Sequence, residues 1–155
     1  MSLLNDGIKK GGINDNDCMK VLITGSRNWS DKDAVEIAIA RAKPDIIIEG
    51  GAKGADAIAK AYAHKTFRKV IEVKAEWDKY GKKAGGIRNS TMLAMKPDLV
   101  LAFSNDLSND KGTRDTVDKA TKKGIKVWWV RSKDSIGIIE PFIKKNLIKQ
   151  QRIKI

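Results

Sequence analysis

Short apolar runs alternate with helix-like segments five times along this chain, and this alternation limits the fold more than any other feature. Strands that are apolar on both faces are typical of parallel sheets covered by helices on both sides. The pattern therefore predicts an α/β protein with a three-layer, Rossmann-like, doubly wound and mainly parallel five-stranded sheet. The predicted strands are 20–24, 45–49, 69–73, 98–103 and 125–130.

Capping and breaking residues place helices between these strands. Ser30 or Asp31 can cap the first helix, and Gly124 is a typical residue just after a helix end. Residues 1–18 read as a flexible N-terminal extension, 19–155 as a single domain with a basic C-terminal helix, and 74–83 as an irregular loop. The predicted helices are 31–43, 54–66, 84–95, 113–123 and 136–149.

Composition excludes several classes of protein. No apolar run approaches the ~20 residues that a membrane span needs, and the first 17 residues lack the apolar stretch of a secretory signal. Cys18 is the only cysteine, so no internal disulfide can form, which fits a reducing compartment. We therefore expect a cytoplasmic protein without a membrane partner.

Positive charge is concentrated late in the chain. The formal net charge is +12, and residues 119–155 contain eleven Lys and Arg, opposed only by Asp134 and Glu140. Such a surface attracts polyanions by releasing their counterions, or it is simply a solvated face. Trp128, Trp129 and Phe142 look like core positions rather than exposed stacking platforms for single-stranded nucleic acid.

Glycine-bearing segments follow strands or open helices at four places: 25–29, 50–56, 84–89 and 111–115. The carboxyl ends of parallel strands share one sheet edge, where ligands bind at the point at which strand order reverses. Glycine-rich turns and helix N-termini present backbone N–H groups that bind phosphate. The predicted ligand-binding residues are Gly25, Ser26, Arg27, Trp29, Gly50, Gly51, Gly54, Ala55, Asp56, Trp77, Arg88, Asn89, Gly112 and Thr113.

Each polar candidate also has an ordinary structural interpretation. Asp56 either caps its helix or accepts a hydrogen bond from a ribose hydroxyl. Arg27 either pairs with phosphate or is merely exposed. Thr113 either binds phosphate or is an N-cap. Arg88 and Asn89 follow two glycines at a helix start, so both are expected to face the same crevice.

The aromatic and histidine residues have similar alternatives. Trp29 either stacks on a base or plugs the sheet edge. Trp77 and Tyr80 either form a lid over a base or anchor the loop around them. His64, the only histidine, lies late in its helix, so we expect it to have no catalytic role. One His and one Cys do not make a transition-metal cluster, and we expect neither metal nor cofactor.

Several of these motifs occur together in one known family. The chain resembles the YspA/YpsA-related branch of the SLOG superfamily over about residues 19–130. This resemblance implies a Rossmann-like sheet that binds a nucleotide or nucleotide-derived ligand, in proteins often found in bacteria and phages. The matching motifs are Gly25-Ser26-Arg27-x-Trp29, Gly50-Gly51-Ala52-x-Gly54-Ala55-Asp56, Trp77-x-x-Tyr80-Gly81, Ala84-Gly85-x-x-Arg88-Asn89-x-x-Met92, Gly112-Thr113 and Gly124-Ile125-x-Val127.

The chain departs from the catalytic pattern of the related LOG phosphoribohydrolases, which carry P-G-G-x-G-T-x-x-E. Gly112-Thr113 matches this pattern, but Thr116 stands where the glutamate is expected. Arg88 matches the arginine of the catalytic pair. Cleavage of an N-glycosidic bond needs a carboxylate, by analogy with glycosidases. Asp115 or Glu49 could substitute, but the sequence does not position either of them.

The resemblance therefore favours a binding protein over an enzyme. We expect an ADP-ribose-like ligand at the strand ends, in a phage-type sensor or sequestering protein acting in the host cytoplasm. One alternative is a phosphoribohydrolase that cleaves a nucleoside 5'-monophosphate with Arg88 as catalytic residue. Another is nucleic-acid binding through the basic face. The apolar positions of 136–147 pack on the sheet or form an interface, and we expect a homo-oligomer.

Overall fold

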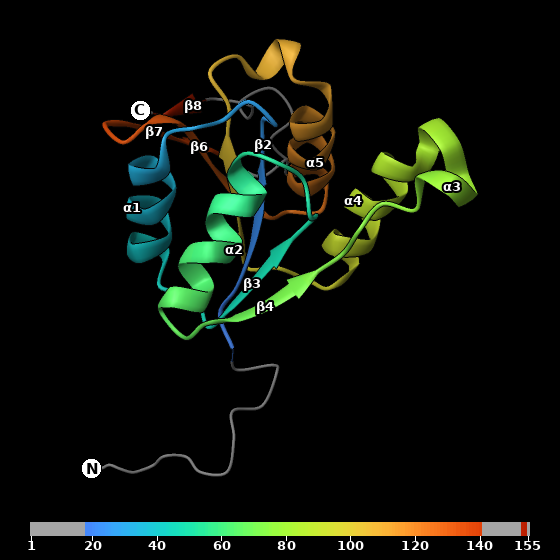
Figure 1. Cartoon of the computed structure of the whole chain (residues 1–155). Coiled ribbons are helices and arrows are strands. Elements are labelled where there is room, and N and C mark those ends of the chain that lie inside the picture. The colour runs from blue at the N-terminus through green and yellow to red at the C-terminus, as the bar shows by residue number, and fades with distance from the viewer. Residues whose placement is uncertain (1–17, 141–152, 155) are drawn as a thin grey trace.

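The computed structural model describes residues 18–140 and 153–154, so the predictions for 1–17, 141–152 and 155 lie outside the described residues. One seven-stranded sheet forms the centre of the molecule, with strand order β4-β3-β2-β5-β6-β7-β8 (Figure 1). The strands are β2 (Lys20–Gly25), β3 (Ile46–Glu49), β4 (Lys69–Glu72), β5 (Leu99–Phe103), β6 (Lys126–Ser132), β7 (Ser135–Ile139) and β8 (Ile153–Lys154).

The first five strands pair in parallel, as predicted. β2 lies at the centre of the parallel part, with β3 on one side and β5 on the other. β7 and β8 extend the sheet in antiparallel pairing beyond β6. The chain runs outward from β2 to β4, then returns to β5 beside β2, so strand order reverses between β2 and β5. In such a sheet this reversal marks the ligand edge.

Helices cover both faces of the sheet. Residues of α1 and α2 join the core cluster on one face, and residues of α4 and α5 join the cluster on the other. This is the predicted three-layer, doubly wound arrangement. The helical segments are α1 (Lys32–Ala42), α2 (Ala55–Lys65), α3 (Trp77–Tyr80), η2 (Gly81–Lys83), α4 (Ala84–Ala94), η3 (Leu107–Asn109) and α5 (Lys111–Lys122).

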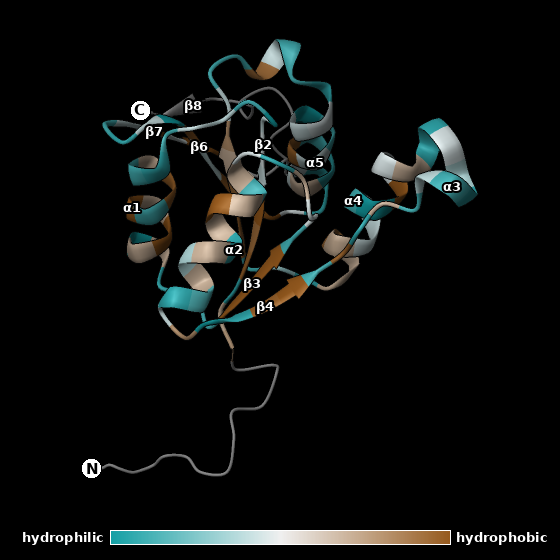
Figure 2. Cartoon of the chain, viewed as in Figure 1, coloured by the Kyte–Doolittle hydropathy of each residue, from teal (hydrophilic) through white to brown (hydrophobic). Residues whose placement is uncertain are grey.

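The core follows directly from the period of two in the strands. Val21 and Ile23 of β2 pack with α1 and α2, whereas Leu22 between them packs with α4 and α5. All three side chains are fully buried. In Figure 2 the central strands are accordingly the most hydrophobic part of the ribbon. Both faces of the central strands are therefore buried, as in other parallel sheets.

Two sequence predictions are wrong in this region. The helix expected from Ile136 is instead β7, which forms a hairpin with β6, with Ser132 opposite Ser135. Ile136 packs with one core cluster and Ile139 belongs to the other. The two residues therefore lie on opposite faces of the strand. The loop predicted at 74–83 contains two short helical turns, α3 and η2. None of the described helices is long and apolar enough to cross a membrane.

Candidate functional site

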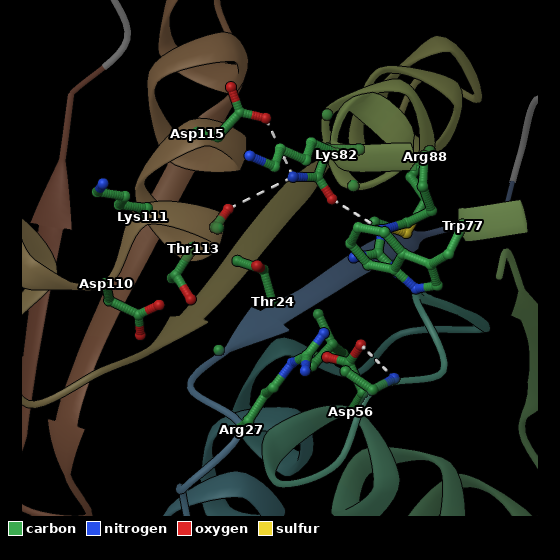
Figure 3. A pocket seen from close by; sticks show the side chains of 18 residues that line it. Thr24, Arg27, Asp56, Trp77, Lys82, Arg88, Asp110, Lys111, Thr113 and Asp115 are labelled. Atoms are coloured by element: carbon green, nitrogen blue, oxygen red, sulfur yellow. Dashed lines mark hydrogen bonds between the residues drawn. The ribbon is translucent and has the colours of Figure 1, made fainter. Parts of the chain in front are cut away.

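Two adjoining hollows lie at the carboxyl edge of the sheet, beside the reversal point. The first hollow has a volume of about 420 Å³, and its walls come from the end of β2, the β3–α2 turn, α4 and the start of α5 (Figure 3). The second hollow, of about 630 Å³, lies between the β2–α1 turn and the segment that follows β5. Arg27, Asp110 and Lys111 line both. The hollows therefore form one cleft with a shared border.

The turn between β3 and α2 is closed by its own carboxylates. The Asp56 Oδ2 atom accepts hydrogen bonds from the amides of Gly50 at 3.0 Å and Ala52 at 3.2 Å. Glu49 Oε1 accepts from the amide of Gly51. These three N–H groups are already satisfied within the protein, so they do not present donors to a phosphate as the sequence suggested. Asp56 caps the turn rather than the helix.

The glycines around this turn make room for protein atoms. A Cβ on Gly50 would lie 2.5 Å from Nη1 of Arg88, and a Cβ on Gly25 would lie 2.6 Å from the Cβ of Ala55. Gly54 has φ 76° and ψ −127°, a conformation that essentially only glycine adopts. Its Cβ would also collide with the carbonyl oxygen of Ser26. The glycine motif of this turn is thus explained by packing.

The start of α5 is different, because it is open. Gly112 would meet no atom within 4 Å if it carried a Cβ. Thr113, in the first turn, is only 2% exposed, yet its Oγ1 has no hydrogen-bond partner among the described residues. The helix N-cap is Asp110, whose side chain makes no capping hydrogen bond. Thr113 is therefore not an N-cap, and it is one of the residues that line the first hollow.

Arg88 and Asn89 hold the cleft together from α4. Arg88 donates through Nη1 to the carbonyl of Gly50 at 2.6 Å and through Nε to Oδ1 of Asn89 at 2.9 Å. Asn89 Nδ2 donates to Asp115 Oδ2 at 3.0 Å and to the Gly112 carbonyl at 3.4 Å. Both residues line the first hollow. Their hydrogen bonds connect the β3–α2 turn, α4 and α5. They act mainly as positioning residues.

The cations of the cleft come from three different elements. Arg27, Lys82 and Lys111 line the first hollow, and all three residues are exposed. None forms an ion pair with a described acidic residue within 4 Å, whereas Asp115 is paired with Lys119 at 3.0 Å. A negatively charged ligand can therefore gain these three cations without breaking a salt bridge.

The aromatic residues take separate positions. Trp77 is 49% exposed and lines the first hollow. Trp29 is 7% exposed, packs against Phe103 with ring centroids 5.7 Å apart, and donates its indole N–H to the Asp31 carbonyl. Trp29 borders the second hollow as a packed wall and plugs the sheet edge. Tyr80 lies outside both hollows, at the end of α3.

Three carboxyl groups in and beside the closed turn have perturbed pKa values. The pKa of Glu49 is raised to about 8, first by burial and then by a hydrogen bond with Glu72. The pKa of Glu72 is lowered to about 2, first by its hydrogen bond with Lys60 and then by that with Glu49. Glu49 and Glu72 are register partners on β3 and β4, and burial favours the protonated form of Glu49. Burial also raises the pKa of Asp56 to about 6.

Comparison with known proteins agrees with this architecture. The sequence model of the YspA, cpYpsA-related SLOG family matches residues 19–80. The Gene 61 protein of Mycobacterium phage D29 is 40% identical over 118 residues, which cover 70% of this chain and 93% of that relative. The chain belongs to the YspA, cpYpsA-related SLOG family.

A solved structure extends the likeness of this SLOG protein to the fold. It resembles the X-ray structure of DNA processing protein A (DprA) from Streptococcus pneumoniae with a TM-score of 0.60 and 22% identity. The match covers 71% of this chain and 49% of that one, so the SLOG chain spans about half of DprA. At this identity the likeness shows a shared Rossmann-like fold.

Sequence reasoning missed several residues of this SLOG site. Thr24, Lys82, Asp110, Lys111 and Asp115 line the first hollow but were not among the predicted ligand residues. Lys111 and Asp110 directly precede Gly112-Thr113, so their place at a helix start was a usable signal. Lys82 carries no such signal, because α3 and η2 bring it to the cleft. Ser26 Oγ accepts from the Asn28 amide within its own turn.

The structure also shows where Thr116 lies, the residue that stands in place of the LOG glutamate. Thr116 is fully buried, and its hydroxyl donates back to the Gly112 carbonyl at 3.5 Å. No carboxylate therefore reaches the cleft from this position. Asp115 does line the cleft, but its Oδ2 accepts hydrogen bonds from Asn89 and Lys119. Glu49 lies outside both hollows, and His64 is exposed near the end of α2.

Proposed function

We propose that this SLOG protein binds a nucleotide or nucleotide-derived ligand of the ADP-ribose type, with a phosphate seated at the start of α5. The observation that carries the proposal is at Thr113, a residue that is 2% exposed and lines the first hollow, and whose buried hydroxyl has no partner in the described chain. A buried polar group without a partner costs about 1–3 kcal/mol. A ligand oxygen that accepts from this hydroxyl removes that cost.

The surrounding backbone favours an anion at the same place. α5 has twelve residues, and its first N–H groups lack a side-chain cap. Aligned peptide dipoles leave partial positive charge at a helix N-terminus, which favours phosphate. Gly112 has open space where other residues carry a Cβ, so a phosphate can approach the backbone there. The open turn, rather than the closed β3–α2 turn, provides the proposed donors.

Charge and stacking complete the proposed site. Arg27, Lys82 and Lys111 supply positive charge from three sides of the first hollow. The half-exposed ring of Trp77 provides a surface for a base, because every base can stack on an aromatic face. Asp56 lines the same hollow and offers a carboxylate to a ribose hydroxyl. Family membership and the phage relative support a nucleotide-related role, and a phage-type sensor or sequestering protein fits a site that binds without an evident catalytic pair.

A matched pair of threonine variants tests the phosphate seat. Thr113→Val removes the unpartnered hydroxyl, whereas Thr121→Val makes the same change later on α5, at a buried residue outside both hollows. We expect calorimetric titration to show that Thr113→Val weakens binding of AMP or ADP-ribose about tenfold. Thr121→Val should leave the affinity unchanged. If neither nucleotide binds the unmodified protein, the proposal is wrong.

A second candidate function rests on Asp56. This carboxyl is 6% exposed, lines the first hollow and has a pKa raised by burial to about 6, in the range useful for proton transfer. It can serve hydrolysis of the N-glycosidic bond of a nucleoside monophosphate by orienting water at the sugar. Incubation with AMP followed by chromatography for free adenine tests this activity. If the Asp56→Asn variant releases adenine as fast as the unmodified protein, Asp56 has no role in the reaction.

A further inference from the structure

We infer that two copies of this chain pair through an exposed face of α4, related by a two-fold axis. Four large apolar side chains are exposed among the described residues, those of Phe67, Trp77, Tyr80 and Ile87. The last three lie on α3 and the first turn of α4, and α3 projects from the rest of the molecule in Figure 1. Scattered exposed apolar residues are ordinary, whereas a group of them on one surface marks an interaction site.

The outer face of α4 carries a ridge between two hollows. Ile87 and Thr91 line both hollows, and residues four apart lie one above the other on a helix. The hollow on the β4 side has a volume of about 480 Å³, and Ile71 and Tyr80 contribute to its apolar lining. The hollow on the α5 side has a volume of about 610 Å³ and reaches Lys119 of α5. We call them the glutamate hollow and the lysine hollow, after the charged residues on their outer rims.

The lysine hollow matches the ridge in shape. Gly86, Ser90 and Ala94 line it from the row of α4 next to the ridge, so short side chains leave a groove beside Ile87 and Thr91. Helices pack by placing one row of side chains, four residues apart, into the groove beside the equivalent row of another helix. A ridge and a matching groove on one face complement themselves. A two-fold axis fills both grooves at once, with each ridge in the groove of the other copy.

The polar groups of this face are already satisfied, as burial in an interface requires. The Thr91 hydroxyl donates to the Ile87 carbonyl at 3.0 Å. The Ser90 hydroxyl accepts from Nζ of Lys119 at 3.0 Å, and the same Nζ pairs with Asp115 at 3.0 Å. Covering the ridge and the groove with a second α4 therefore leaves neither hydroxyl without a partner.

Charge favours a second copy as the occupant. Glu76 lines the glutamate hollow and Lys82 and Lys83 line the lysine hollow, on opposite sides of the ridge. None of these three side chains has an ion-pair partner within 4 Å in the part of the chain that the structure describes. The cations of the glutamate hollow, Lys74 and Arg88, are already bound within their own copy.

The two-fold axis turns this order of charges into complementarity. Across the face of one copy the order is glutamate hollow, ridge and lysine hollow, and the axis reverses that order in the other copy. When each ridge enters the lysine hollow of the other copy, the Glu76 rim of one therefore faces the Lys82 and Lys83 rim of the other. Opposite charges that meet in this way fix the register of an interface.

Light scattering of the full chain over a series of concentrations measures the pairing. We expect a mass that rises with concentration toward twice the 17.1 kDa of one chain. Ile87→Asp places a charge on the ridge and should weaken association at least about tenfold. Phe67→Asp makes the same kind of change at a residue that is 96% exposed and outside both hollows, and it should leave association unchanged.

A charge exchange tests the two-fold arrangement with exposed residues that lie outside the first hollow of the cleft. Lys83→Glu and Glu76→Lys should each weaken association about fivefold, because like charges then face each other across the axis. The two substitutions together in one chain should restore the original affinity, since opposite charges meet again. Urea unfolding of each variant confirms that the chain is folded.

The outcomes do not depend on nucleotide binding. A mass that stays at 17.1 kDa up to about 1 mM protein overturns the inference. A dimer that Ile87→Asp leaves intact, or that Phe67→Asp weakens equally, has its contact elsewhere and also overturns it. A double charge variant that pairs more weakly than either single variant shows that Glu76 does not face the lysines, which overturns the two-fold arrangement.

Discussion

Two glycine-bearing turns at the same sheet edge have opposite uses. In the β3–α2 turn, protein atoms fill the space beside Gly50 and Gly54, and carboxylates occupy the amides of Gly50, Gly51 and Ala52. At the start of α5, the space beside Gly112 is empty and the Thr113 hydroxyl has no partner in the described chain. The first turn is a structural clamp, and the second is the better candidate for a ligand.

The difference shows why a glycine motif is ambiguous. Glycine permits close approach of any group, whether it belongs to a ligand or to the protein itself. The richer motif, with three glycines and an aspartate, is the one satisfied internally. Substitutions in the two turns should therefore affect different properties, namely stability in the closed turn and affinity in the open one.

The largest expected loss of stability from a single substitution at fixed pH comes from Gly54→Ala in the closed turn. Gly54 has φ 76° and ψ −127°, and an added Cβ would collide with the Ser26 carbonyl. We expect a loss of about 3 kcal/mol in the free energy of unfolding, from backbone strain and displacement of the neighbouring turn. Urea denaturation measures it. A loss below about 0.5 kcal/mol would show that the closed turn is not rigid.

The next effect concerns pH and the proton on Glu49. The folded state holds this proton up to a pKa of about 8, whereas the ordinary value is 4.5. Below pH 4.5 this contribution to stability is fully present, and it is lost as the pH rises to 8. One proton gives a slope of at most about 1.4 kcal/mol per pH unit.

Glu49→Gln tests this assignment, since Gln can donate to Glu72 and accept from the Gly51 amide at any pH. The variant should lose much of the decrease in stability between pH 4.5 and 8, with Asp56 still contributing the same sign between 3.8 and 6. Urea unfolding at a series of pH values measures it. An unchanged slope would place the proton elsewhere.

The smallest expected change in stability, and the clearest contrast, comes from Gly112→Ala in the open turn. No atom lies within 4 Å of the added Cβ, and alanine favours a helix over glycine by up to about 1 kcal/mol. The protein should therefore unfold at the same or a slightly higher urea concentration. AMP and ADP-ribose should bind several-fold more weakly, because the methyl group stands where the phosphate approaches. Unchanged affinity would show that the phosphate does not bind next to Gly112.

The sequence predicted the parallel strands and the helices between them because each has a strong local signal. Asp31 caps α1 through a hydrogen bond to the Ala34 amide, as its residue type suggested. β7 was misread as a helix because Ile136 and Ile139 also fit a helical spacing, and the turn at Lys133 and Asp134 contains no glycine or proline. Only pairing with β6 decides between the two periods.

The site was predictable as a place but not as a set of contacts. Strand ends converge in any doubly wound sheet, and the predicted residues that lie together in the first hollow are Gly25, Arg27, Asp56, Trp77, Arg88, Asn89, Gly112 and Thr113. Whether an amide or hydroxyl there is free depends on which distant side chain reaches it. Arg88 reaches Gly50 from thirty-eight residues away, and no local pattern encodes that contact.

By itself, then, the sequence determined the order of elements, the two apolar faces of the central strands and the edge at which polar residues gather. These follow from periodicity and capping, which act over a few neighbouring residues. The tertiary structure alone decided which glycine turn is filled and which is open. That distinction depends on packing and hydrogen bonds between residues far apart in the chain, which arise only when the layers close around the sheet.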